Sequence, residues 1–364
     1  LFPYTTLFRS MFRQKEILLL FSIVLVGFCF RLFLVLDLPI WIDEAFTLNH
    51  IQLSFLELIS GKFDATHPFG YYLFLKLWSL ISSNLFWLRC STLIFYLLNS
   101  FLFYKLAILV KQKRLAYFLL ILYVFSGYFI IFDWQARMYT GVITLILTSW
   151  YSLKTRKIFL FSVINICGLY FDYAFLWYFI PLTLWLFYQA LRYSQQKRIG
   201  LINVISAWII FAFWIPTLLT TYKNGIEAIS WSARFATPNF FLPYFLGSHT
   251  NILISILFLF FSLFGIFLSF VLEKKFAQFF ILAGSISGLL AFLSSFVWGS
   301  IFHVRNLQIV GLMFLIALAV NLENLWNKRQ KYVVLIFLLI YFFNFLLILQ
   351  AHYFSPNLLL LKFQ

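Results

Sequence analysis

The sequence predicts an all-α, polytopic membrane protein, and three observations lead to that fold class. Hydrophobic residues make up 63% of the 364-residue chain and charged residues only 10%, whereas soluble domains carry roughly 25% charged residues. Apolar runs of the length that a membrane-spanning helix needs, about 20 residues, follow one another almost from end to end. Short clusters of Lys and Arg separate these runs, a pattern that is typical of membrane orientation signals.

About eleven membrane-spanning helices are predicted, within a range of roughly nine to thirteen, from the length of each apolar run. The runs lie near residues 17–38, 84–110, 115–132, 138–153, 158–171, 173–191, 200–220, 251–272, 276–298, 306–326 and 332–350. Two of them, 138–153 and 158–171, are short for a full crossing, which a tilt or a locally thinned bilayer would accommodate.

The charge distribution favours a membrane protein over a nucleic-acid-binding protein. The formal net charge is +16, but the basic residues lie in clusters between apolar runs and form no extended patch. If the N-terminus is cytoplasmic, most Lys and Arg fall on that side and most Asp and Glu fall on the other. We therefore predict a multi-pass protein of the cell (inner or plasma) membrane with a cytoplasmic N-terminus and no nucleic-acid partner.

The chain is predicted to form one membrane domain with short additions at its ends. Residues 1–10 (LFPYTTLFRS) resemble translated sequencing-adapter sequence, so the natural protein is expected to begin at Met11. Residues 11–350 form the transmembrane domain, and 351–364 form a short extracytoplasmic tail. The first extracytoplasmic loop, 39–83, contains two amphipathic stretches, near 43–60 and 67–82, which are predicted to be helices at the membrane interface.

Two adjacent acids, Asp43 and Glu44, stand where the first apolar run ends. Helical spacing puts Asp43, Thr47 and His50 on one face, whereas Glu44 points about 100° away, so the two acids are expected to have different roles. A carboxylate in a partly dry pocket is a candidate general base. The alternative is that both acids only favour a helix N-terminus, an effect of about 0.3–1 kcal/mol.

Further motifs follow in a fixed order along the chain. They are Trp41-Ile42-Asp43-Glu44-Ala45, His67-Pro68-Phe69-Gly70-Tyr71-Tyr72 with Lys76 and Trp78 after it, Trp87-Leu88-Arg89-Cys90-Ser91, Gln135-Ala136-Arg137-Met138-Tyr139, Leu169-Tyr170-Phe171-Asp172-Tyr173 and His303-Val304-Arg305-Asn306-Leu307. This ordered set, over residues 15–310, resembles glycosyltransferase family 39 of the GT-C membrane glycosyltransferases, relatives of the protein O-mannosyltransferases. The chain departs from the family pattern at Gln135, where many relatives have Glu, and at Asp172, where many have His.

The resemblance implies a GT-C fold and a sugar transfer, with inversion, from a polyprenyl-phosphate-linked donor to a hydroxyl acceptor on a lipid, glycan or protein at the extracytoplasmic face. It makes Asp43 the catalytic base and gives Glu44 a supporting catalytic role, orienting the acceptor or a cation. The residues expected to bind the substrate and its phosphate are His67, Tyr72, Lys76, Arg89, Asp133, Arg137, Tyr139, Asp172 and Arg305. Asp133 is the candidate substitute for the acid that Gln135 replaces.

The residue types agree with a lipid-linked donor. The chain has no Gly-rich phosphate loop, so cations near the outer face would have to hold the phosphate, and Arg offers two parallel hydrogen bonds for it. The alternative for these arginines is snorkelling to lipid headgroups. Arg31, inside the first span, is expected to pair with a nearby acid such as Asp37.

No cofactor is assigned from the sequence. Some relatives bind a divalent cation, so Mg²⁺, Mn²⁺ or Zn²⁺ is a candidate, but no pair of ligands here has tight metal-site spacing. Two other kinds of function compete with sugar transfer: a transporter or flippase of lipid-linked sugars, and a non-catalytic, degenerate homologue. A polymerase or ligase of lipid-linked glycans would share the donor, but its key Arg and His would usually lie in a long late loop.

Overall fold

A computed structural model describes residues 4–61, 67–192, 195–219, 243–247, 251–298 and 304–354, which form helices and no strand. The longer helices are α1 (Tyr4–Asp37), α5 (Leu85–Leu109), α6 (Lys113–Val124), α8 (Tyr139–Lys154), α9 (Ile158–Phe171), α10 (Leu176–Arg192), α11 (Gln195–Ala212), α14 (Ile252–Val271), α15 (Lys275–Trp298), α16 (Gln308–Asn327) and α17 (Lys331–Phe354). The shorter ones are α2 (Ile42–Gln52), α3 (Phe55–Ser60), α4 (Gly70–Ser79), α7 (Gly127–Ile130), η1 (Tyr173–Phe175) and η3 (Val304–Asn306).

The structure confirms the all-helical fold class and the multi-pass character of the chain. Within the described residues, eight helical segments are long and apolar enough to cross a membrane, and α8, α9 and α11 fall outside that set. Each predicted run does contain a helix, but the count of eleven crossings and the GT-C arrangement stay predictions. The first helix begins at Tyr4, and residues 355–364 of the predicted tail lie outside the described part.

The first interfacial stretch, predicted as one helix over 43–60, is two helices. The break follows Gln52, where α2 ends, and α3 begins with its own cap at Ser54. The Ser54 hydroxyl accepts the Glu57 backbone N–H at 3.3 Å, and the Glu57 carboxylate accepts the Ser54 N–H at 2.7 Å. This reciprocal capping box specifies a helix start, and the Ser-x-x-Glu signal is visible in the sequence.

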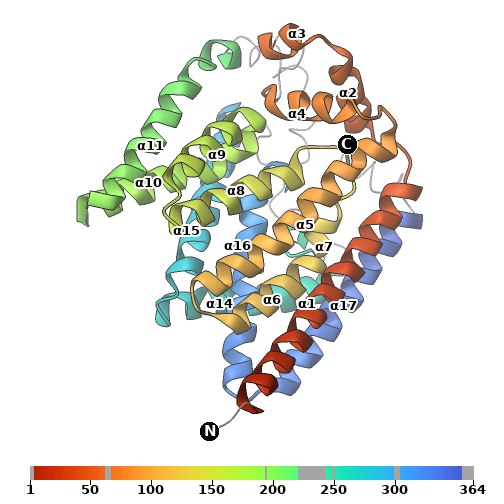
Figure 1. Ribbon diagram of the computed structural model, residues 1–364, viewed down its shortest axis with the longest axis vertical. Helices are drawn as coiled ribbons and strands as arrows, with labels where there is room; N and C mark the ends of the chain where they lie inside the picture. Colours follow the sequence, from red (N-terminus) through yellow and green to blue (C-terminus); the bar gives the residue numbers. More distant parts are fainter. Residues whose placement is uncertain are drawn as a thin grey trace.

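The two ends of the helical bundle carry different chemistry. At the end where α1 starts, Lys113 pairs with Glu16, and Lys274 pairs with Glu323. The opposite end is covered by α2, α3 and α4 (Figure 1), which bring Asp43 and Glu44. Asp43 and Glu44 therefore lie at the end opposite these two lysines, while the segregation of charge across the membrane and the side that faces the cytoplasm stay predictions.

Helix α16 lies in the interior and fixes the position of η3, which directly precedes it. Its residues 308–324 are all buried, and it packs against α6, α14, α15 and α17. Gly265 of α14 permits the closest approach: a Cβ there would lie 1.9 Å from the Ala317 carbonyl oxygen. Small residues at such crossings let membrane helices pack backbone to backbone. The segment that carries Arg305 is thus anchored by the core.

Candidate active site

Asp43 lies in the first turn of α2 and meets residues from two distant parts of the chain. Its carboxylate pairs with the Arg305 guanidinium of η3, 262 residues later. The Tyr139 hydroxyl, at the start of α8, donates to the same carboxylate at 3.5 Å. Asp43 keeps 17% of its side-chain surface exposed and Arg305 keeps 26%, so this ion pair remains within reach of a ligand.

The pKa of Asp43 is lowered from its ordinary value of 3.8. Burial works in the opposite direction, because it disfavours the charged form. The positive charges of Arg305 and then Arg137 outweigh burial. Asp43 is therefore held as a carboxylate at neutral pH, the form in which it can accept a proton.

Arg137 is buried beside Asp43 and is held by neutral groups. Its Nη1 donates to the Asp43 backbone oxygen at 3.2 Å and to the Thr47 hydroxyl at 2.9 Å. Its Nη2 lies 3.0 Å from Nε2 of His67, and its guanidinium carbon lies 5.8 Å from the centre of the Tyr139 ring. Only 3% of Arg137 is exposed. Thr47, which was noted only for sharing a face with Asp43, is thus a direct partner of this arginine.

His67 bridges Arg137 and Asp172. Its Nδ1 lies 2.8 Å from a carboxylate oxygen of Asp172, whose other oxygen accepts the Ala174 N–H at 2.7 Å and caps η1. A guanidinium can only donate, so Nε2 must accept from Arg137 and Nδ1 must carry the proton that is donated to Asp172. The two contacts together specify one neutral tautomer of His67.

Glu44 has surroundings quite different from those of Asp43. It is fully buried and accepts four hydrogen bonds: from Arg89 Nε at 2.9 Å, Arg89 Nη2 at 2.6 Å, Ala136 N at 2.8 Å and Trp41 N at 3.0 Å. Arg89 directs its remaining donors to the carbonyls of Val35, Leu38 and Pro39.

This geometry favours a structural role for both members of the pair. All five N–H donors of Arg89 are used in these contacts, so it has none left for a phosphate, contrary to the expectation from the sequence. Likewise, Glu44 is not exposed to an acceptor or a cation. The pair ties the end of α1, the start of α2, the start of α5 and the segment before Arg137 together.

Arg31 pairs with Asp133 and not with Asp37, which corrects the expected partner. The Arg31 Nε donates to Asp133 at 2.7 Å, and both side chains are enclosed. Thr140 donates to the second oxygen of Asp133 at 2.9 Å. The Arg31 guanidinium also lies 4.0 Å from the centre of the Tyr96 ring. Asp133 therefore has a structural environment and does not contact Asp43, as a substitute acid in the site would be expected to do.

Lys76 and Tyr72 pack against α2 and α3. The Lys76 ammonium donates to the Ile51 carbonyl at 2.8 Å, near the end of α2, and lies 5.3 Å from the Phe55 ring. Tyr72 is buried and stacks on His50 with a ring separation of 4.6 Å. Gln135, the departure from the family pattern, donates to the Ile131 carbonyl at 3.0 Å.

The structure thus brings six of the predicted site residues together, and we call them the Asp43 cluster: Asp43, His67, Arg137, Tyr139, Asp172 and Arg305. Asp43, His67 and Arg305 form its accessible face, since 17%, 15% and 26% of their side-chain surfaces are exposed. The other three members are buried. Among the described residues no group of three or more His, Cys, Asp and Glu could hold a metal ion; His249 and His303 lie outside those residues.

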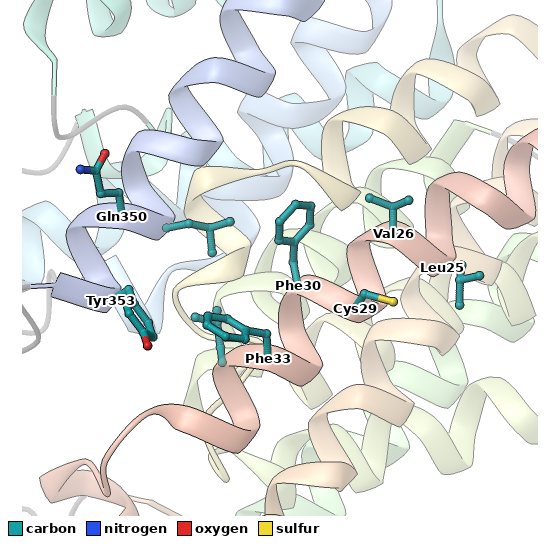
Figure 2. Close-up of a pocket in the computed structure, with 9 residues that line it drawn as sticks. Leu25, Val26, Cys29, Phe30, Phe33, Gln350 and Tyr353 are labelled. Carbon is teal, nitrogen blue, oxygen red and sulfur yellow. The ribbon is translucent and has the colours of Figure 1, made fainter.

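A cavity in the described structure lies away from the Asp43 cluster. It measures about 690 Å³ and is lined by α1 and α17, with Cys29, Phe30 and Phe33 on one side and Gln350 and Tyr353 on the other (Figure 2). The cavity is almost wholly apolar and contains none of the Asp43 cluster. This cavity and the Asp43 cluster are therefore separate features of the described structure.

Comparisons with known proteins give no family assignment. A scan of the sequence against protein-family models found no match, and a search of curated proteins found no similar sequence. The function proposed below therefore depends on the residues, their geometry and the motif resemblance.

Proposed function

We propose that the protein is an integral-membrane glycosyltransferase that transfers a sugar from a polyprenyl-phosphate donor to a hydroxyl acceptor at the extracytoplasmic face of the cell membrane. The observation that carries the proposal is the accessible carboxylate of Asp43, paired with Arg305 and adjoining Arg137 at one end of the bundle. A base next to a concentration of positive charge suits a reaction in which a hydroxyl loses a proton and a phosphate departs.

The reaction is a single displacement. The acceptor oxygen forms a bond to the anomeric carbon while the bond from that carbon to the phosphate oxygen breaks, which inverts the anomeric configuration. Asp43 takes the proton of the acceptor hydroxyl, and the polyprenyl phosphate leaves with the bonding electron pair. Arg305 and Arg137 stabilise the negative charge that grows on the phosphate, because fixed donors in a poorly solvated site act without reorganising.

The position of the cluster favours surface chemistry over transport. Substrate sites of secondary transporters lie near the bilayer midplane, between repeated halves. Here the accessible charged side chains, Asp43 and Arg305, lie at the end of the bundle that α2 and α4 cover (Figure 1). A lipid-linked donor would keep its chain in the bilayer and present its sugar at that level.

The proposal is tested by incubating membranes that contain the protein with polyprenyl-phosphate sugars labelled in the sugar. We expect label to appear covalently on a lipid, glycan or protein, with release of polyprenyl phosphate. Movement of intact labelled donor across the bilayer without covalent transfer would instead support a flippase. Neither transfer nor movement with any donor would support a non-catalytic homologue.

The pH dependence of activity should report the ion pair between Asp43 and Arg305. The pKa of Asp43 is lowered from 3.8, so its protonation should reduce kcat/KM only below that pH. In Arg305→Gln the attraction is lost and burial remains, so the pKa of Asp43 rises and the acidic limb moves to higher pH. Profiles of kcat/KM against pH check this, and identical acidic limbs in both proteins would contradict it.

A further inference from the structure

We propose that His67 and Asp172 act as a positioning device that orients Arg137 without neutralising its charge, so that Arg137 stays available to an anionic phosphate. The inference rests on the proposed function, because it takes the anion to be the phosphate of a polyprenyl-phosphate donor. It gives His67 and Asp172 a role other than direct contact with the substrate.

Arg137 differs from Arg89 and Arg305 in its hydrogen-bond partners. Arg89 and Arg305 each pair directly with a carboxylate, that of Glu44 or Asp43. Among the described residues Arg137 forms no such ion pair, and its hydrogen bonds go to a backbone oxygen, a hydroxyl and an imidazole. A direct ion pair offsets part of the field of a guanidinium, whereas neutral acceptors fix its orientation and leave its charge.

His67 is the residue that separates Arg137 from a carboxylate. The imidazole lies between the Arg137 guanidinium, at 3.0 Å, and the Asp172 carboxylate, at 2.8 Å. Asp172 accepts the Nδ1 proton, which leaves the Nε2 lone pair directed at Arg137. The Ala174 N–H fixes the position of the Asp172 carboxylate. The carboxylate in turn fixes the orientation of the His67 imidazole, and the imidazole fixes that of the Arg137 guanidinium.

Arg137 also retains an unused donor. Its Nε is buried and has no hydrogen-bond partner among the described residues. Buried polar groups are nearly always satisfied, so an unsatisfied one calls for a physical explanation, such as a ligand or ion that the structure does not contain. A charged donor with spare hydrogen-bonding capacity, in a residue that is 3% exposed and adjoins the more accessible Arg305, is suited to a phosphate oxygen.

The test compares two substitutions at His67 in the purified full-length chain. His67→Gln keeps a neutral acceptor for Arg137, whereas His67→Glu places a carboxylate there and turns the contact into a direct ion pair. The probes are a polyprenyl phosphate and the matching polyprenol, which lacks the phosphate. Binding is measured from the dependence of Tm on probe concentration.

We expect His67→Glu to bind the polyprenyl phosphate about ten- to a hundredfold more weakly than the wild type, the range for losing a hydrogen bond to a charged group. Its Tm without ligand should change little, because the ion pair gained with Arg137 is offset by repulsion from the Asp172 carboxylate, which lies 2.8 Å from Nδ1 of the native His67. His67→Gln should bind nearly as the wild type does. A merely structural role predicts that the two variants, which are of similar stability, bind the polyprenyl phosphate equally well.

Wild-type affinity in a folded His67→Glu protein, or equal losses in both variants, would overturn the inference. If His67→Glu does not fold, Asp172→Asn replaces it: that change keeps an oxygen for Ala174 but loses the anionic acceptor for Nδ1, and unchanged binding would overturn the inference. If the proposed function itself is wrong, the experiment gives a different result. The wild type would then bind polyprenyl phosphate no better than polyprenol, which would overturn the donor assignment and the inference with it.

Discussion

Replacing Asp43 by Asn should lower the rate of sugar transfer about 10²–10⁴-fold, the usual contribution of a positioned general base. Asn has nearly the same shape and can still accept a hydrogen bond from Arg305, so the fold and the donor site should be retained. What is lost is a group that can take the acceptor's proton. The loss should therefore appear in kcat, measured with saturating labelled donor, and only weakly in KM.

The matched control is Asp37→Asn. Asp37 is an exposed acid at the end of α1, so the substitution removes the same charge from the same end of the bundle without touching the Asp43 cluster. Wild-type rates are expected for it. If both variants transferred sugar at the wild-type rate while inserted and folded, Asp43 would not be the base.

Replacing Glu44 by Ala should destabilise the protein by about 3–5 kcal/mol, the cost of removing one partner of a buried ion pair. Arg89 would then keep its charge in an enclosed site, 1% exposed, with carbonyl oxygens and the Trp134 ring for support but no anion. The backbone N–H groups of Ala136 and Trp41 would lose their acceptor as well. The change is measured as the free energy of unfolding in detergent, alongside Tm.

The control for Glu44 is Glu16→Ala at the opposite end of the bundle. Glu16 also pairs with a cation, Lys113, but the side chains of that pair are 40% and 54% exposed, and exposed ion pairs contribute only about 0–1 kcal/mol. A Glu44→Ala protein as stable as Glu16→Ala would contradict the structural role. A strong loss of sugar transfer in Glu44→Ala with no loss of stability would also contradict the structural role, and would indicate that Glu44 is catalytic.

The sequence predicts part of the difference between the adjacent acids Asp43 and Glu44. Helical periodicity separates Asp43 from Glu44 by about 100°, and the structure does direct them to different partners. Which of the two is buried could not be read in the same way, because that depends on Arg89, 45 residues away. The predicted membrane topology places the arginines near the outer face, but it does not indicate which acceptors their N–H groups contact.

Long-range pairing also explains the remaining differences. Arg31 was assigned to Asp37 because the two are close in the chain, whereas the packing of α1 beside the segment after α7 brings Asp133 to it from 102 residues away. The bridge from Asp172 through His67 to Arg137 joins three separate segments, so no local pattern could reveal it. In contrast, the break between α2 and α3 was predictable, since Ser54 and Glu57 form a recognisable capping box.

Asp43 is proposed to act as the base in a covalent sugar transfer from a polyprenyl-phosphate donor. The most direct measurement uses purified wild-type and Asp43→Asn proteins in liposomes that contain sugar-labelled donor and the identified acceptor. We predict that the wild type moves label to the acceptor and releases one polyprenyl phosphate for each sugar, and that Asp43→Asn does so about 10²–10⁴-fold more slowly. Equal transfer by the two proteins, or movement of donor across the bilayer with its sugar still attached, would contradict the claim.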